Sequence, residues 1–80
     1  MGEEALAIGR IVHYVLDEGV SRGEHRPAIV IKIWDENGEV CNLQVFTDSA
    51  NDTLPGVMWE RLVKHDETGT QEGTWHWPED

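Results

Sequence analysis

Apolar and polar side chains alternate along several short stretches of the chain, and this period of two is typical of β-strands. Residues 57–65 also fit a short helix, but Gly56 precedes them and β-branched and tryptophan residues occur within them, which favours a strand. Pro78 closes the last stretch, because proline cannot donate to a sheet. The predicted strands are residues 9–16, 28–34, 40–47, 57–65 and 74–77.

The polar segment between the second and third strands predicts a hairpin. A two-residue turn at Asn37-Gly38 would place amide side chains among isoleucines. A three-residue turn at Glu36-Asn37-Gly38, with Gly38 in the left-handed conformation, keeps apolar residues together. We predict this second turn, which leaves Val30, Lys32, Asn42 and Gln44 on the wetter face of the hairpin. Its pairs are Ile33 with Cys41, Ile31 with Leu43, and Ile29 with Val45.

Polar segments rich in Gly, Asp and Asn connect the predicted strands at residues 17–27, 48–56 and 66–73. Five short strands joined in this way predict an all-β fold, a small five-stranded SH3-like barrel, because closure hides the edges that an open sheet exposes. We expect residues 9–80 to form a single barrel domain and residues 1–8 to be an N-terminal extension.

Charge and cysteine content narrow the class of partner. The chain of 80 residues has 6 basic and 16 acidic residues and a net charge of −10, which disfavours direct binding to nucleic acid or to a membrane. No secretory signal is recognisable, and a single cysteine allows no internal disulfide, so a cytoplasmic protein is expected. Glu60 is the only acidic residue in the predicted strands. A local basic patch is therefore expected from the strand residues Arg10, Lys32, Arg61 and Lys64.

Four segments of the chain, residues 9–15, 26–30, 42–46 and 73–79, resemble a group of short uncharacterised proteins encoded by bacteriophages and prophages. The run Gly73-Thr74-Trp75-His76-Trp77-Pro78-Glu79 is the most specific part of the resemblance. It implies a small barrel of phage origin in the bacterial host cytoplasm, and it supplies no active site. Other short phage proteins act as oligomeric sponges for nucleotide signals of bacterial immunity, to which this chain is similar in size and origin alone.

The candidate ligand-binding residues are aromatic or basic. Aromatic faces stack on nucleobases and hold cations, and arginine and histidine donate hydrogen bonds to anions. Each residue also has a structural interpretation: the tryptophans fill the barrel or an interface, Arg26 and His25 pair with Glu24 on a solvated loop, and Arg61 lies at the barrel rim or in an interface. The candidates are Tyr14, His25, Arg26, Trp59, Arg61, Trp75, His76 and Trp77.

Catalysis and metal binding have little support in the sequence. The four histidines are separated by long intervals, Cys41 is alone, and no pair has the spacing of a zinc site, so no metal and no cofactor are predicted. The chain contains no nucleophile motif, no P-loop and no dinucleotide-binding motif, so we do not expect an enzyme.

Two functions from different classes remain. The first is a phage accessory protein that binds a host small molecule, most plausibly a cyclic nucleotide or related small anion that serves as an immune signal, between the subunits of a homo-oligomer. The second is an acidic protein-interaction module that binds a basic host protein, mimics nucleic acid or serves the virion. The first uses the aromatic and basic residues, and the second uses the net charge directly.

Overall fold

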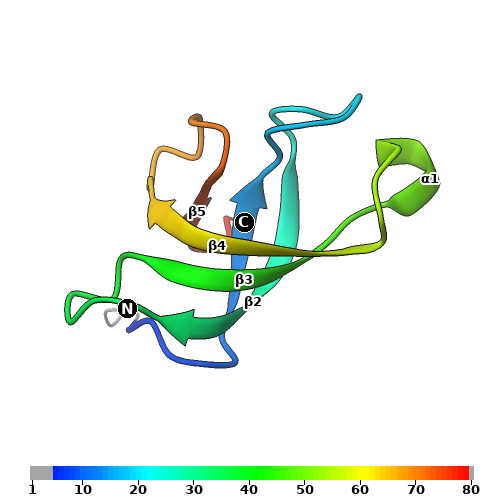
Figure 1. Ribbon diagram of the computed structural model, residues 1–80. Helices are drawn as coiled ribbons and strands as arrows, with labels where there is room; N and C mark the ends of the chain where they lie inside the picture. Colours follow the sequence, from blue (N-terminus) through cyan, green and yellow to red (C-terminus); the bar gives the residue numbers. More distant parts are fainter. Residues whose placement is uncertain (1–4, 80) are drawn as a thin grey trace.

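The computed structural model describes residues 5–79, which form a closed five-stranded barrel (Figure 1). Neighbouring strands are antiparallel, except that β4 and β5 pair in parallel, and the pairing of β5 with β1 closes the barrel. The predicted all-β, SH3-like barrel is confirmed, and the segment 57–65 is a strand. The elements are β1 (Ile11–Val15), β2 (His25–Ile33), β3 (Cys41–Phe46), α1 (Ser49–Asp52), β4 (Val57–His65) and β5 (Thr74–His76).

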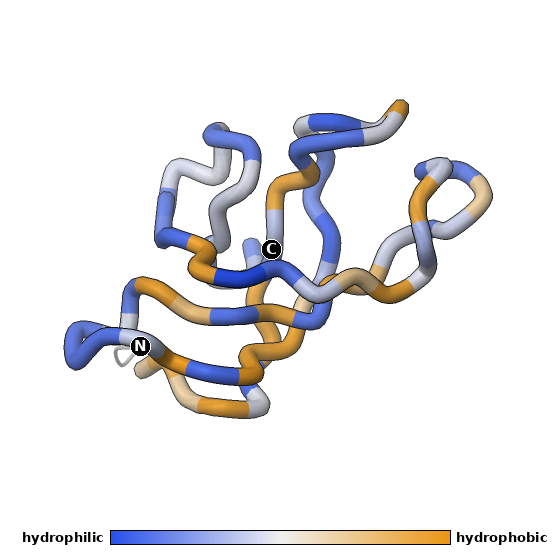
Figure 2. The backbone as a smooth tube through the Cα atoms, viewed as in Figure 1, coloured by the Kyte–Doolittle hydropathy of each residue, from blue (hydrophilic) through white to orange (hydrophobic). Residues whose placement is uncertain are grey.

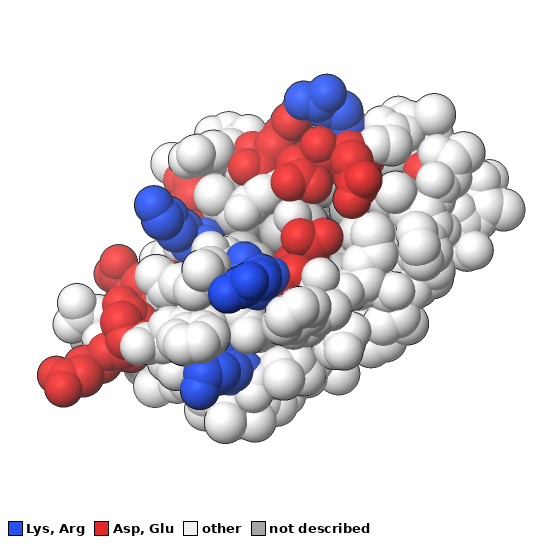
Figure 3. Space-filling model, viewed as in Figure 1, with Lys and Arg blue, Asp and Glu red and all other residues white. Residues whose placement is uncertain are grey.

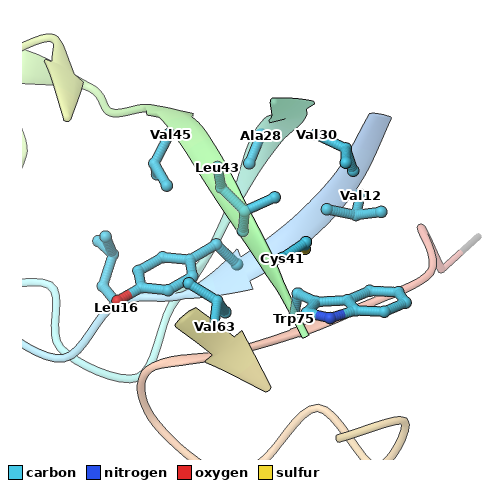
Figure 4. Close-up of a cluster of buried hydrophobic side chains, with 10 residues drawn as sticks. Val12, Leu16, Ala28, Val30, Cys41, Leu43, Val45, Val63 and Trp75 are labelled. Atoms are coloured by element: carbon cyan, nitrogen blue, oxygen red, sulfur yellow. The ribbon is translucent and has the colours of Figure 1, made fainter. Parts of the chain in front are cut away.

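Alternate residues of the strands face inward and form one core, as the period of two requires (Figure 4). Apolar residues recur along the strands between hydrophilic positions (Figure 2). Burial of each Val or Leu side chain contributes about 1.5–3 kcal/mol, so these few residues supply most of the stability of the barrel. The core consists of Val12, Tyr14, Leu16, Ala28, Val30, Cys41, Leu43, Val45, Val63 and Trp75, with Leu6 and Trp77 packed against it.

The turn of the β2–β3 hairpin agrees with the sequence prediction. Gly38 has a φ of 69°, which is the left-handed conformation, and its amide donates to the carbonyl of Asp35. The first predicted pair, Ile33 with Cys41, is present. Only glycine adopts this φ without a steric penalty, so the local sequence sets the turn.

Beyond that first pair the predicted hairpin register is wrong. A β-bulge between Val30 and Lys32 inserts one residue into β2 and turns Val30, rather than Ile31, toward the core. Val30 is fully buried and Ile31 is 42% exposed. Asn42, predicted on the wetter face, is also buried, and its Oδ1 accepts hydrogen bonds from the Trp34 indole and the Leu62 amide. The observed pairs are Val30 with Leu43 and Ala28 with Val45, in place of Ile31 with Leu43 and Ile29 with Val45.

The loop after β1 is shorter than predicted. β2 begins at His25, so His25 and Arg26 belong to a strand and not to the loop at residues 17–27. Backbone hydrogen bonds between Leu16 and Glu24, and between Gly23 and Leu16, continue the β1–β2 ladder beyond the strand ends. As a consequence, His25 and Arg26 have fixed orientations on opposite faces of β2.

Charge is distributed over the surface much as predicted. Acidic side chains gather mainly at the upper and left edges of the face in Figure 3, where a basic group also lies, and the other basic side chains lie between these edges beside an acidic group. Among the described strands Glu60 is the only acidic residue, while Arg26, Lys32, Arg61 and Lys64 are basic; Arg10 precedes β1. No helix in the described residues is long and apolar enough to cross a membrane.

Candidate functional site

β5 separates two groups of side chains with different chemistry. Trp75 faces the core, whereas His76, the next residue, faces the opposite side of the strand. Trp77 packs against the core on the same side as Trp75. An aromatic pocket therefore lies on one side of β5 and a histidine cluster lies on the other.

The aromatic pocket is a cavity of about 380 Å³ between β5, the end of β4 and the β2–β3 turn. Trp75, Trp77 and His65 form its aromatic wall, and Leu6 contributes an aliphatic side chain. Glu36 and Glu39 lie at its rim, and no Lys or Arg lines it within the described residues. This volume falls in the range of small-ligand sites.

Trp75 is a fixed wall of this pocket. It is 1% exposed, and its indole Nε1 donates to the carbonyl oxygen of Glu39 at 2.9 Å, which ties β5 to the β2–β3 turn. His65 stacks on it with ring centroids 4.3 Å apart and an interplanar angle of 22°. A ligand can therefore contact only the part of the Trp75 ring that His65 and the Glu39 carbonyl leave uncovered.

Trp77 is the more accessible wall. Its ring meets Trp75 edge to face, with centroids 5.3 Å apart, and the guanidinium of Arg10 lies 5.3 Å from its centroid. The Trp77 backbone amide donates to Glu67 Oε1 at 3.4 Å, and Glu67 Oε1 also lies 2.6 Å from Nε2 of His65. The pocket thus combines flat faces with carboxylates, which suits a planar group that carries hydrogen-bond donors or positive charge.

Three other predicted ligand-binding residues lie outside the pocket. Tyr14 is 1% exposed in the core, where burial and nearby carboxylates, Glu60 first, raise the pKa of its hydroxyl. Trp59 and Arg61 are exposed on the outer face of β4 and do not line the pocket. The structure therefore does not bring all the predicted aromatic and basic residues into one site.

Arg26 is held by a buried carboxylate rather than presented to a ligand. Its Nε and Nη2 donate to the two oxygens of Asp52 at 2.8 and 2.6 Å, and the Asp52 side chain is fully buried. Glu24 accepts a further hydrogen bond from Nη2, and the carbonyl of His25 accepts one from Nη1. Hydrogen bonds to Asp52 from Arg26 first, and then from the Asp48 amide and the Ser21 side chain, hold the pKa of Asp52 far below its usual range. His25, the residue before Arg26, faces the opposite side of β2.

The histidine cluster consists of His13 on β1, His25 on β2, His76 on β5 and Glu79 after β5. One potential ligand atom from each of these residues lies within 4.8 Å of all the others. His13 and His76 are direct cross-strand partners, and His25 is opposite Val15, two residues from His13 on the same face. His76 is almost fully buried, whereas His13 and His25 are partly exposed and Glu79 is half exposed.

Glu79 is the centre of this cluster. Its carboxylate contacts Nδ1 of His13, lies 2.8 Å from Nδ1 of His25, and lies 3.1 and 3.2 Å from Nε2 of His76. Hydrogen bonds from the imidazoles, His13 first, lower the pKa of Glu79 to about 2. Three imidazoles and a carboxylate are a ligand set that zinc accepts.

Sequence reasoning missed this cluster because its members come from three strands and a tail. The intervals between His13, His25 and His76 match no compact metal motif, and only the closure of the barrel by β1 and β5 makes them neighbours. A partial signal was present: His13 and His76 lie on the face of their predicted strands opposite Tyr14 and Trp75, and Glu79 follows His76 by three residues, whereas His25 lies in a predicted loop.

The fold and these sites define a small closed β-barrel with an aromatic pocket and a histidine cluster on opposite sides of one strand. Comparisons with protein-family models, with curated proteins and with solved structures found no match to this chain. Its function therefore has to be inferred from the two sites.

Proposed function

We propose that this protein is a non-enzymatic binding protein that holds the nucleobase of a small molecule in the aromatic pocket beside Trp77. The observation that carries the proposal is the pocket itself, in which an accessible tryptophan lies next to carboxylates at the rim. In a phage accessory protein, as the sequence resemblance implies, such a pocket would sequester a nucleotide signal of the host.

Stacking and hydrogen bonding both favour a base in this pocket. A base stacked on an aromatic side chain gains about 1–3 kcal/mol. Glutamate oxygens accept hydrogen bonds from exocyclic amino groups, as they do from cytosine. Glu36 and Glu39 lie at the rim, where the amino-bearing edge of a stacked base would face them.

The phosphates of a nucleotide would have to lie outside the pocket. Carboxylates at the rim repel them, and the ion pair with Asp52 occupies Arg26, which was expected to bind them. Arg10, over the ring of Trp77, is the basic side chain that approaches the pocket wall. In this proposal the base therefore contributes most of the binding free energy of a nucleotide, and the phosphates contribute little.

The burial of three groups that could act in catalysis, Cys41, Asp52 and Tyr14, supports a binding role. The Cys41 thiol is buried in the core, and burial raises its pKa to about 12, so it is neither ionised nor accessible near neutral pH. Asp52 is neutralised by Arg26, and Tyr14 is enclosed in the core.

Assembly into a homo-oligomer, with ligand held between subunits, stays a prediction. Self-association through a face outside the pocket is supported by apolar side chains exposed on the outer face of β3 and β4: Val57 is 53% exposed, Trp59 is 56% exposed, and Phe46, the partner of Val57, is 38% exposed. Covering such a face is a common reason for self-association. The alternative, an interaction module for a basic host protein, is supported by the acidic loops at the edges of the barrel (Figure 3).

Calorimetry with free nucleosides and with mono-, cyclic di- and cyclic trinucleotides tests the proposal. We expect at least one nucleoside and its nucleotides to bind with similar affinity, and Trp77→Ala to weaken binding at least about tenfold because the stacking face is lost. Trp59→Ala is the matched control: it removes an equally large aromatic residue from the outer face of β4 and should leave the affinity unchanged.

Two results would contradict this proposal. No heat with any nucleoside or nucleotide at high protein concentration would leave the acidic interaction module as the better account. Loss of binding in Trp59→Ala, with binding retained in Trp77→Ala, would move the ligand site from the pocket to the outer face of β4.

A further inference from the structure

We propose that His13, His25, His76 and Glu79 bind one Zn²⁺ ion, which fastens β5 and the segment after it to β1 and β2. The proposal goes beyond nucleobase binding and does not depend on it, because the cluster faces away from the aromatic pocket.

The ligand set fits zinc in type and number. Zn²⁺ prefers four ligands in a tetrahedron and takes imidazole nitrogen and carboxylate oxygen at about 2.0–2.2 Å. Donor atoms in such a tetrahedron lie about 3.4 Å apart, by the geometry of those bond lengths. The four donor atoms here lie within 4.8 Å of one another, so no donor pair exceeds the tetrahedral separation by more than about 1.4 Å.

Hydrogen bonding around His25 calls for a proton or a metal ion between His25 and Glu79. Its Nε2 lies 2.9 Å from the carbonyl oxygen of Gly69, which can only accept, so Nε2 carries the hydrogen. In the neutral ring Nδ1 then presents a lone pair, and that lone pair faces the Glu79 carboxylate at 2.8 Å. Two acceptors in contact repel each other unless a proton or a metal ion lies between them. Zinc satisfies both acceptors, and the bond from Nε2 to a carbonyl is the usual support for a metal-binding histidine.

His76 presents its Nε2 to the cluster, because that nitrogen lies 3.1 and 3.2 Å from the Glu79 carboxylate oxygens. The residue is 2% exposed, and its Nδ1 is the single buried side-chain nitrogen or oxygen without a hydrogen-bond partner among residues 5–79. Buried polar atoms are nearly always satisfied, and a group left unsatisfied costs about 1–3 kcal/mol. An ion bound through Nε2 leaves Nδ1 beside the Gly69 backbone, so the zinc site is supported by the four clustered donor atoms and not by this nitrogen.

The backbone at Gly69 lies close to the imidazole rings of His25 and His76. Gly69 lies in the left-handed region with a φ of 70°, and a Cβ atom there would lie 3.2 Å from Cε1 of His76 and 3.3 Å from Cε1 of His25. Glycine thus lets the loop between β4 and β5 cover both imidazoles and place its carbonyl on one of them.

A zinc ion bound by these residues would strengthen the attachment of β5, which closes the barrel through few residue pairs. β5 has three residues and pairs with β1 and with β4 through two residue pairs each. Ligands from β1, β2, β5 and the segment after β5 would join these elements through one ion, as structural zinc does in other small domains.

The test is a zinc titration of full-length protein that has first been treated with a chelator and dialysed into metal-free buffer. We expect one Zn²⁺ per chain by elemental analysis, a higher unfolding temperature with zinc than without, and a visible Co²⁺ spectrum of a four-coordinate site when cobalt replaces zinc. Glu79→Gln and His13→Gln should each weaken zinc binding at least about tenfold. Glu79 is half exposed, so its variant should remain folded.

Glu72→Gln is the matched control, because Glu72 pairs with Arg22 on the surface and has no contact with the histidines. It should bind zinc with wild-type affinity. Failure of the wild-type protein to bind zinc, in purified or refolded form, would overturn the proposal. Equal zinc binding by wild type, Glu79→Gln and His13→Gln would also overturn it, because the ion would then be held by other groups.

Discussion

His25 and Arg26 are adjacent in the sequence, yet they belong to two regions of the barrel that differ in how completely their polar groups are satisfied. Arg26 faces Asp52, and the carboxylate of that residue accepts hydrogen bonds from Nε and Nη2 of the guanidinium and from the Asp48 amide. Both ring nitrogens of His25 face acceptors: Nδ1 faces the Glu79 carboxylate and Nε2 faces the carbonyl of Gly69. The neighbouring His76 has a nitrogen, Nδ1, without a hydrogen-bond partner.

The difference distinguishes a structural polar site from one built for a ligand. A charged pair whose hydrogen bonds are complete needs nothing from solution and serves to hold the chain together. A cluster with excess acceptors is stable only when it takes up a proton or a metal ion. Residue type alone would have ranked Arg26 above His25 as a binding residue, and the hydrogen-bond inventory reverses that order.

The largest effect is expected from breaking the complete pair. Arg26→Ala leaves the Asp52 carboxylate buried without its partner, and loss of one partner of a buried ion pair costs about 3–5 kcal/mol. Urea unfolding of the variant should therefore show a much lower midpoint than the wild type. A variant of unchanged stability would mean that Asp52 is solvated, and the contrast with the histidine cluster would then lose its basis.

An intermediate effect is expected at Gly69. Gly69→Ala meets both an unfavourable φ and a close approach to two histidine rings, so we expect it to cost about 2 kcal/mol and to weaken zinc binding. Gly9→Ala is the matched control, because Gly9 also has a positive φ but open space around the new Cβ, and it should cost only about 1 kcal/mol without affecting zinc. Equal losses in both variants would show that only φ matters and that the loop does not need to approach the rings.

The smallest effect is a change in stability with pH. The pKa of Asp52 is lowered in the folded protein, so its stabilisation is complete above the unfolded value of about 3.9 and is lost as pH falls below it. The stability of wild type relative to Asp52→Asn should be constant between about pH 5 and 7 and should decrease below about pH 4. Urea midpoints of both proteins at several pH values measure this difference, and a difference that already falls near pH 6 would contradict the lowered pKa.

Much of the fold could be predicted from the sequence, because alternation and turn residues are local signals. The strands, the barrel and the left-handed Gly38 follow from such signals. The bulge at Ile31 does not, because an inserted residue changes which side chains face inward without changing the pattern on either side of it. The start of β2 at His25 was missed because its charged residues resemble a loop until Asp52 is seen to neutralise Arg26.

The sites were predictable only in part. Of the candidate residues, Trp75 and Trp77 line a pocket, whereas Trp59 and Arg61 lie on another face. The histidine cluster depends on the pairing of β1 with β5, a contact between distant parts of the chain that no local pattern encodes. Long-range closure of the barrel is therefore what turns scattered histidines into a site.

The most direct test of this account is a crystal structure of the protein grown with Zn²⁺, with anomalous scattering recorded at the zinc absorption edge. We predict one strong anomalous peak per chain at about 2.0–2.2 Å from a nitrogen of each of His13, His25 and His76 and from an oxygen of Glu79. The Arg26 and Asp52 pair should be unchanged beside it. A map without a peak among these four residues, with Glu79 still in direct contact with the imidazoles, would contradict the account.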